Sequence, residues 1–118
     1  MAVRRRNSAL EILELFRRAL PQPTVTDLTV LFYVAENPGL NIAELADVSR
    51  TTLATASRVS RAFAAPDAEG ALPPYLGLIE LKPNPHYAKG RLLYLTEAGK
   101  ALIDEADKMI GEAIRVYP

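Results

Sequence analysis

The stretch NIAELADVSRTTLATASRVSRAF, residues 41–63, contains two short amphipathic segments separated by a polar break. The first segment, residues 42–48, predicts a helix of about one and a half turns. In the second, Leu53, Ala56 and Phe63 recur at helical spacing and are expected to face inward. Two short helices joined by a brief polar link describe a helix-turn-helix.

The charges of this stretch are unusual for the chain. Positions 48–66 carry no acidic side chain, although the whole chain has 14 basic and 14 acidic residues and no net formal charge. A second acid-free window covers positions 81–96, and the two windows together hold six of the basic residues. Such segregation predicts a positive face suited to a polyanion, because a carboxylate there would repel phosphates while hydroxyls can donate to them. The alternative is that the windows arise by chance and the basic helix face is merely solvated.

Elements on both sides complete one predicted domain of residues 1–118, which is long enough to bury a core. Prolines and glycines mark the breaks between elements, and hydroxyl side chains stand where helices should begin. The predicted elements are a flexible basic arm (1–7), a helix (8–20), a helix from Thr24 or Thr26 to about 36, the helix-turn-helix with its second helix starting near Thr51 or Thr52, a loop (64–75), a β-hairpin (78–95, strands 78–82 and 91–95) and a last helix (97–117).

The composition excludes several functional classes. Cysteine is absent and His86 is the only histidine, which argues against disulfides, thiol chemistry, a zinc site and a histidine-based triad. No acidic residue is paired with a nucleophile or a phosphate-binding glycine loop, so we expect no enzyme and no cofactor. No signal peptide and no run of ~18 apolar residues is present, which favours the cytoplasm over a membrane.

The order helix, helix, helix-turn-helix, hairpin, helix is the winged-helix layout, and three segments resemble the MarR-type transcriptional regulators of bacteria and archaea. These segments are TVTDLTVLFYVAENPGLNIAELA (24–46), TASRV (55–59) and GLIELKPNPHYAKGRLLYLTEAG (77–99). The resemblance covers most of residues 24–100. It implies a mainly α fold with a small β-hairpin, a DNA-binding lobe over 24–96 whose wing is 78–95, and dimerisation helices at 8–20 and 97–117.

The same resemblance implies a function. Proteins of this type are homodimeric, sequence-specific DNA-binding regulators, so we expect a repressor of a pseudo-palindromic operator, located with the nucleoid in a prokaryotic cytoplasm. Many respond to a small aromatic effector. The chain departs from the pattern at the wing tip, where Tyr87 to Lys89 replace an aspartate and arginine, and in the loop 64–75, which resembles an insertion of roughly ten residues. Typical members also continue into a further C-terminal helix.

The second helix of the helix-turn-helix and the hairpin are the candidate DNA-binding elements. In a winged helix, that second helix enters the major groove with its N-terminal residues nearest the bases. A guanidinium can donate two hydrogen bonds to one guanine, which makes Arg58 the best candidate for base recognition. The predicted contacts from this helix are Thr51, Thr52, Thr55 and Arg58 to base edges or phosphates, and Arg50 and Arg61 to phosphates. The predicted contacts from the wing are Lys82, His86, Lys89 and Arg91, to a minor groove or the DNA backbone.

Each of these roles has a structural alternative. Thr51 or Thr52 can serve only as the helix cap, and the hairpin tip can be solvated without a partner. The arginines of the arm 1–7 can follow the phosphates or form a solvated tail.

The first and last predicted helices have wide apolar stripes, wider than one small domain can cover, so the excess should meet a second copy of the chain. The predicted dimer contacts are Ile12, Leu15, Ala106, Ile110, Ala113 and Tyr117. The alternative is that both stripes belong to the intramolecular core. A second functional hypothesis is a winged-helix module that binds a protein partner in a mobile-element or replication assembly.

Overall fold

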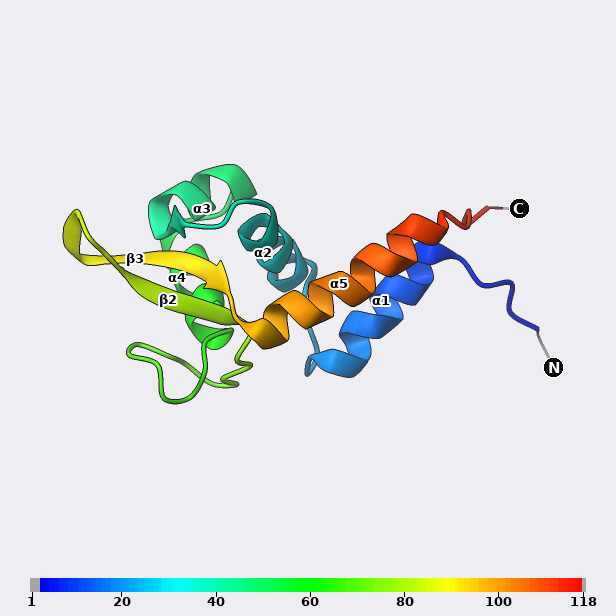
Figure 1. Cartoon of the computed structure of the whole chain (residues 1–118), viewed down its shortest axis with the longest axis horizontal. Helices are drawn as coiled ribbons and strands as arrows, with labels where there is room; N and C mark the ends of the chain where they lie inside the picture. Colours follow the sequence, from blue (N-terminus) through cyan, green and yellow to red (C-terminus); the bar gives the residue numbers. More distant parts are fainter. Residues whose placement is uncertain (1–2, 118) are drawn as a thin grey trace.

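A computed structural model of the chain describes residues 3–117 and is elongated, with principal extents of 56 × 25 × 24 Å. Two helices, α1 and α5, lie side by side at one end, and the remaining helices gather around a small sheet at the other (Figure 1). The elements are α1 (Ser8–Ala19), α2 (Val25–Glu36), β1 (Leu40–Asn41), α3 (Ile42–Ser49), α4 (Leu53–Ala62), β2 (Ile79–Asn84), β3 (Tyr87–Leu95) and α5 (Glu97–Glu112).

Side-chain caps begin the helices and explain why the predicted starts hold. The Thr24 hydroxyl accepts from the Asp27 backbone N–H at 3.0 Å, and the Asp27 carboxylate accepts from the Thr24 N–H at 2.9 Å, which forms a capping box. Asn41 and Glu44 form a second such box before α3. Thr52 caps α4 by accepting from the Thr55 N–H at 3.0 Å. Thr52, and not Thr51, is therefore the cap of α4.

The sheet is larger than the hairpin that the sequence predicts. Its three antiparallel strands are ordered β1-β3-β2, and the short β1 pairs Leu40 with Leu93. The strands β2 and β3 extend through Pro83 and Gly90, which the prediction placed in the connection. Proline is tolerated there because β2 is an edge strand, and the backbone groups along its outer edge have no neighbouring strand to pair with. The pairing register shifts between Pro83 and Asn84, close to the tip.

One continuous apolar core connects the two ends of the molecule. The rings of Phe16 from α1 and Phe32 from α2 meet edge to face with centroids 5.4 Å apart. The core continues through the helix-turn-helix and the sheet, and Ala106 of α5 belongs to it. Its fully buried large side chains are Phe16, Phe63, Leu31, Leu45, Ile79, Leu93, Val30, Val34 and Val59.

The last helix is shorter than predicted. It ends at Glu112, and Ala113 takes a left-handed backbone conformation with φ of 51° that a helix cannot continue through. The chain then meets the start of α1, where the Ser8 N–H donates to the Ile114 carbonyl at 3.0 Å and the Ile114 N–H donates to the Ser8 hydroxyl at 2.9 Å. The prediction of helix over 113–117 is therefore wrong.

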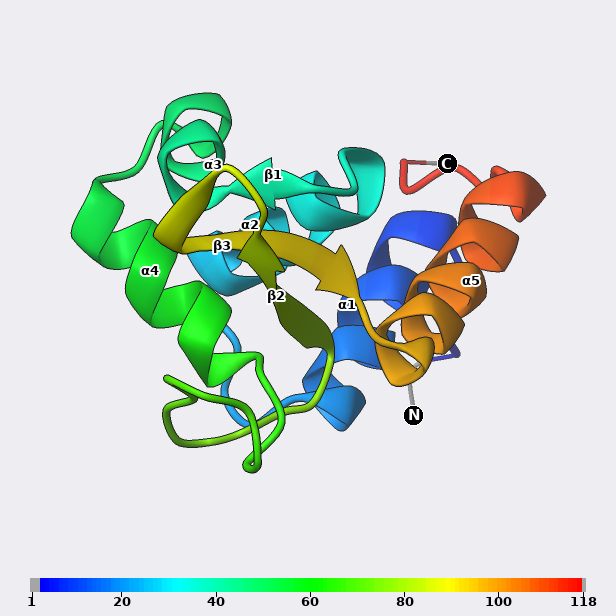
Figure 2. The same cartoon turned by 60° about the vertical axis from the view of Figure 1, so that its left-hand side comes forward.

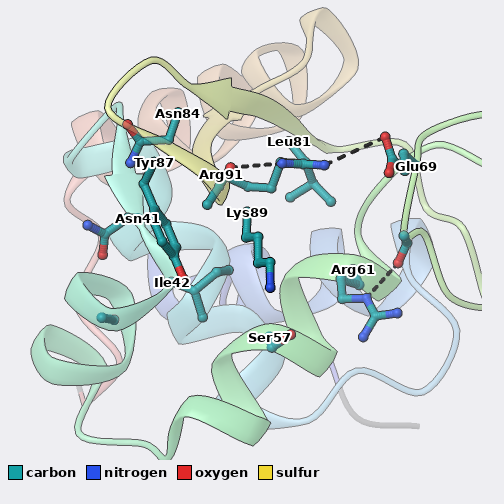
Figure 3. Close-up of a pocket in the computed structure, with 13 residues that line it drawn as sticks. Asn41, Ile42, Ser57, Arg61, Glu69, Leu81, Asn84, Tyr87, Lys89 and Arg91 are labelled. Carbon is teal, nitrogen blue, oxygen red and sulfur yellow. Dashed lines mark hydrogen bonds and ion pairs between the residues drawn. The ribbon is translucent and has the colours of Figure 1, made fainter.

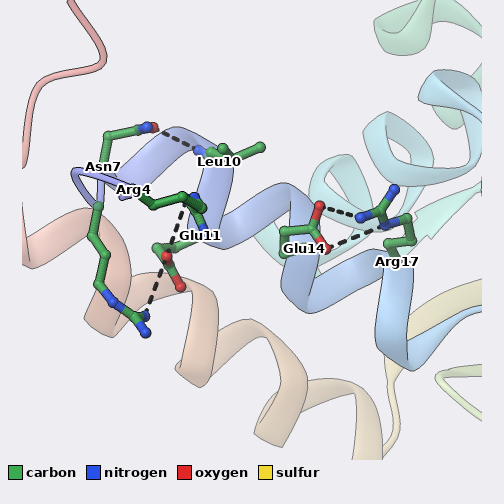
Figure 4. Close-up of polar contacts among 7 residues, drawn as sticks. Arg4, Asn7, Leu10, Glu11, Glu14 and Arg17 are labelled. Atoms are coloured by element: carbon green, nitrogen blue, oxygen red, sulfur yellow. Dashed lines mark hydrogen bonds and ion pairs between the residues drawn. The ribbon is translucent and has the colours of Figure 1, made fainter. Parts of the chain in front are cut away.

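The N-terminal arginines lie at this same end. Arg4 and Arg6 each reach the carboxylate of Glu11, at 3.5 and 3.4 Å, and Asn7 caps α1 (Figure 4). Arg5 donates to the backbone carbonyls of Arg115 and Val116. Within one copy of the chain, the described part of the predicted arm thus lies far from α4 and the wing (Figure 1). Among residues 3–117, no helix has the length and apolar character needed to cross a bilayer.

Candidate nucleic-acid interface

The helix α4 packs one face into the core and leaves the other in solvent. Its core face contains Ala56, Val59 and Ser60. Since residues three and four apart share a helix face, Ala54, Arg58 and Arg61 form the opposite stripe. Ala54 and Arg58 are exposed and Arg61 is half-buried. Burial of the core face therefore presents two of the predicted basic residues outward.

The wing has two faces, and its basic residues are divided between them. Successive side chains of a strand point to opposite faces, so Lys89 and Arg91 share a face and Lys82, which pairs with Leu92, lies on the other. Lys89 and Arg91 face α4 across a cavity. The ammonium of Lys82 instead lies 4.7 Å from the ring centroid of Tyr94. Lys82 therefore does not share the face of Lys89 and Arg91, and its predicted contact with DNA stays a prediction.

A cavity of 470 Å³ separates α4 from the wing (Figure 3). The side chain of Lys89 extends from β3 toward Ser57 and Arg61 of α4 (Figure 3). Figure 2 shows the same wing lying beside α4 from another direction. The cavity is lined by Asn41, Ile42, Ala43, Ser57, Arg61, Glu69, Gly70, Leu81, Asn84, Tyr87, Lys89, Gly90 and Arg91. Three cationic side chains from two elements, Arg61, Lys89 and Arg91, thus converge on one groove.

The loop that follows α4 closes one side of this groove. The Arg61 Nε donates to the Gly70 carbonyl at 2.6 Å. A guanidinium nitrogen of Arg91 lies 3.6 Å from the Glu69 carboxylate, and another donates to the Gly90 carbonyl at 2.9 Å. The groove therefore contains an acidic side chain, although the two sequence windows that form most of it contain none.

The other predicted contacts lie outside this groove. Arg58 is exposed and lines a second cavity of 430 Å³, which α4 forms with the link between α1 and α2 and with Pro73 and Pro74. Arg50 is exposed in a left-handed conformation, with φ of 55°, at the turn between α3 and α4. His86 is exposed at the wing tip. The fold thus gathers three predicted residues in the groove and spreads these others around it.

The hydroxyl groups of the three predicted threonines take part in local hydrogen bonds. Thr51 and Ser49 share a hydroxyl–hydroxyl contact of 2.9 Å, so Thr51 belongs to the turn rather than to α4. The Thr52 hydroxyl caps the helix and also donates to the Thr55 hydroxyl at 3.1 Å. Thr55 keeps its own hydroxyl proton for a further acceptor.

Several residues of the interface were not found from the sequence. Leu53 was expected to face the core but is 59% exposed, because it starts the first turn of α4 where the helix leaves the core. Ser57 lines the groove, and its spacing of four from Arg61 was a usable signal. Tyr87 lines it as well. No local pattern could have placed Glu69 there, because its position depends on how the loop folds back.

The predicted dimer contacts differ in how exposed the structure leaves them. Ala106 has 0% exposure inside the core and offers no surface to a partner, which corrects that prediction. Ile12 and Leu15 are half-buried and pack against the core. Ile110, Ala113 and Tyr117 are exposed, the last two beyond the end of α5. Other apolar side chains of this end, which were not predicted as dimer contacts, are also exposed: Val3, Leu10, Leu13, Ile114 and Val116.

No protein-family model matches the chain, and no curated protein matches it. Solved structures do match. Wild-type MarR from E. coli, in its apo form, has a TM-score of 0.61 at 20% identity, over 89% of this chain and 72% of that chain. CouR, a transcriptional repressor bound to a 23-mer DNA duplex, has a TM-score of 0.62 at 21% identity, over 91% of this chain and 67% of that chain. The fold is that of the MarR-type winged-helix regulators.

A third similar structure is that of BpsR from Bordetella bronchiseptica, a protein whose DNA binding is regulated by 6-hydroxynicotinic acid. It has a TM-score of 0.59 at 16% identity, over 90% of this chain and 74% of that chain. These matches confirm the predicted fold class, mainly α with a small sheet in a winged-helix arrangement. In this fold α4 is the second helix of the helix-turn-helix, and β2 and β3 form the wing.

Proposed function

We propose that the protein is a sequence-specific, double-stranded DNA-binding transcriptional regulator that acts as a repressor. The observation that carries the proposal is the groove between α4 and the wing, where Arg61, Lys89 and Arg91 converge from two walls. Cations on both walls can contact phosphates on either side of a DNA groove and release their condensed counterions. In a nominally neutral chain, this local gathering supplies the attraction that net charge does not.

Sequence would be recognised by the exposed face of α4. Arg58 is free to enter a major groove and donate two hydrogen bonds to a guanine. The exposed Leu53, near the start of the helix, suits contact with a thymine methyl group. Thr52 and Thr55 would contact phosphates or base edges at the N-terminal end of the helix, and Arg50 and His86 would contact the backbone.

The proposed active form is a homodimer joined through α1, α5 and the segment after α5. Among residues 3–117, seven of the twelve exposed large apolar side chains belong to this end of the molecule: Val3, Leu10, Leu13, Ile110, Ile114, Val116 and Tyr117. Such a concentration is typical of a surface that a partner covers. A two-fold dimer would place two α4 helices in successive major grooves about 34 Å apart, on a pseudo-palindromic operator.

Regulation by a small aromatic effector is part of this proposal. It is supported by the similarity to BpsR, whose DNA binding 6-hydroxynicotinic acid regulates, rather than by a feature of this chain. DNA binding would place the protein with the nucleoid in a prokaryotic cytoplasm.

A winged-helix module that binds a protein partner is the second candidate. The exposed apolar end is the observation that favours it, since a different protein could cover that end in place of a second copy.

An electrophoretic shift with the DNA upstream of the protein's own gene, compared with a random duplex over a salt series, tests the proposal. We expect tighter binding of the upstream DNA and a steep salt dependence. Arg58→Ala should lose about 1–3 kcal/mol on the upstream DNA and little on the random duplex, because it removes a base contact. Equal losses on both duplexes would remove Arg58 from base recognition. Absence of binding to either duplex at low salt would favour the protein-interaction module.

A further inference from the structure

The loop of residues 65–77 is fixed to the end of α4 by its backbone. The N–H groups of Leu72 and Leu76 donate to the carbonyls of Arg61 and Ala62 at 2.9 and 3.1 Å. The Leu78 N–H donates to the Phe63 carbonyl at 2.8 Å. These carbonyls belong to the last turn of α4 and to its C-cap Phe63, where a regular helix offers no N–H one turn further along. The loop is therefore tied to α4, and its position beside the groove is set by hydrogen bonds.

This anchoring brings Glu69 to the rim of the groove. Its side chain is 89% exposed, and its carboxylate lies 3.6 Å from a guanidinium nitrogen of Arg91, which is 27% exposed (Figure 3). The adjacent Gly70 carbonyl accepts from Arg61. Two adjacent residues of one loop therefore each contact one arginine of the groove, Glu69 contacting Arg91 and Gly70 contacting Arg61. Lys89 has no ion pair among the described residues.

We propose that Glu69 is an internal competitor for DNA phosphate. The inference rests on the proposed function, because it concerns how the same groove binds DNA. A phosphate that approaches Arg91 must displace the Glu69 carboxylate or lie beside it, and either event costs free energy. An exposed ion pair of this kind is weak, so the cost lowers affinity without abolishing binding. Glu69 thus weakens binding to any duplex, independent of its sequence.

The test uses Glu69→Gln, which keeps the size of the side chain and removes its charge. Binding to a short fluorescein-labelled duplex of random sequence is measured by fluorescence anisotropy at low salt. We expect about threefold tighter binding than for the unchanged protein, with the gain diminishing as salt rises. Asp67→Asn is the matched control, because Asp67 is exposed in the same loop, carries the same charge and has no ion pair among residues 3–117. It should change affinity less than Glu69→Gln does.

A double-variant cycle identifies Arg91 as the group for which the two anions compete. Arg91→Gln alone should weaken binding, and Glu69→Gln should give no gain in that background beyond that of Asp67→Asn. The inference would be overturned if Glu69→Gln tightened binding by no more than Asp67→Asn does. It would also be overturned if the gain from Glu69→Gln persisted in the Arg91→Gln background. If the unchanged protein binds no duplex at low salt, the proposed function itself fails and the inference falls with it. Thermal unfolding of Glu69→Gln should be unchanged, since the side chain is exposed.

Discussion

The two ends of this elongated molecule expose different kinds of surface. At the end formed by α3, α4 and the wing, three cationic side chains, Arg61, Lys89 and Arg91, face a common cavity, with the carboxylate of Glu69 at its rim. At the end formed by α1, α5 and the segment that follows, large apolar side chains such as Leu13 and Ile110 face solvent. Both ends share one apolar core, so the contrast is one of surface and not of packing.

The contrast indicates which physical force acts at each end. Binding at the groove would depend on salt, because it exchanges phosphate counterions for side chains. Association at the apolar end would depend on buried area and hardly on salt. A protein whose net charge is zero can serve both purposes only by separating them in space. Three pairs of substitutions probe this division, starting with the contact between α5 and the residue that precedes β2.

Gly99 of α5 lies close against the backbone of Leu78, the residue directly before β2. A Cβ built there would lie 2.2 Å from the Leu78 carbonyl oxygen, whereas at Gly111 of the same helix it would meet no atom of residues 3–117 within 4 Å. Gly99→Ala should therefore destabilise the protein by about 2–3 kcal/mol, because backbone must shift to admit the methyl group. Gly111→Ala should stabilise it by about 0.5–1 kcal/mol through helix propensity. Chemical denaturation measures both, and similar values for the two variants would contradict the tight approach.

Leu13 tests the apolar end. Leu13→Glu places a charge on an exposed apolar surface of α1, and we expect it to weaken self-association by about 2 kcal/mol without unfolding the chain. Light scattering after size-exclusion chromatography measures the mass. Val25→Glu is the control, since Val25 is also exposed but lies on α2, outside the proposed seam. A monomeric unchanged protein, or equal effects of the two substitutions, would exclude this end as the dimer interface.

The two lysines of the wing test the charged end with the smallest expected effect. Lys89→Ala should weaken binding to every duplex about fivefold and lower the magnitude of the salt slope by about 0.9, as expected for the loss of one phosphate contact. Lys82→Ala removes the same charge from the opposite face, where Lys82 lies over Tyr94, and should change binding less. Anisotropy titrations over a salt series measure both. Equal slopes for the two variants would show that the face of the wing does not matter.

The helices could be predicted because their signals are local. Pro21 and Pro23 end the first helix, and Thr24, Asn41 and Thr52 cap the next ones through bonds that span only three residues. The helix-turn-helix and the hairpin followed from spacing and turn residues in the same way. The interior positions of the last helix were also predicted, but its end was not, because the backbone of Ala113 and the contact with Ser8 involve a distant part of the chain.

The sequence by itself determined the order of elements, the winged-helix layout and the acid-free composition of α4 and β3, because these depend on residues a few positions apart. Tertiary structure alone decided that Lys82 turns away from Lys89 and that Ala106 is buried within one chain. It also brought Glu69 into a groove whose other lining residues include no acid. These placements depend on strand register and on a loop folding back across the molecule, and such contacts between distant residues leave no periodic signal in a single sequence.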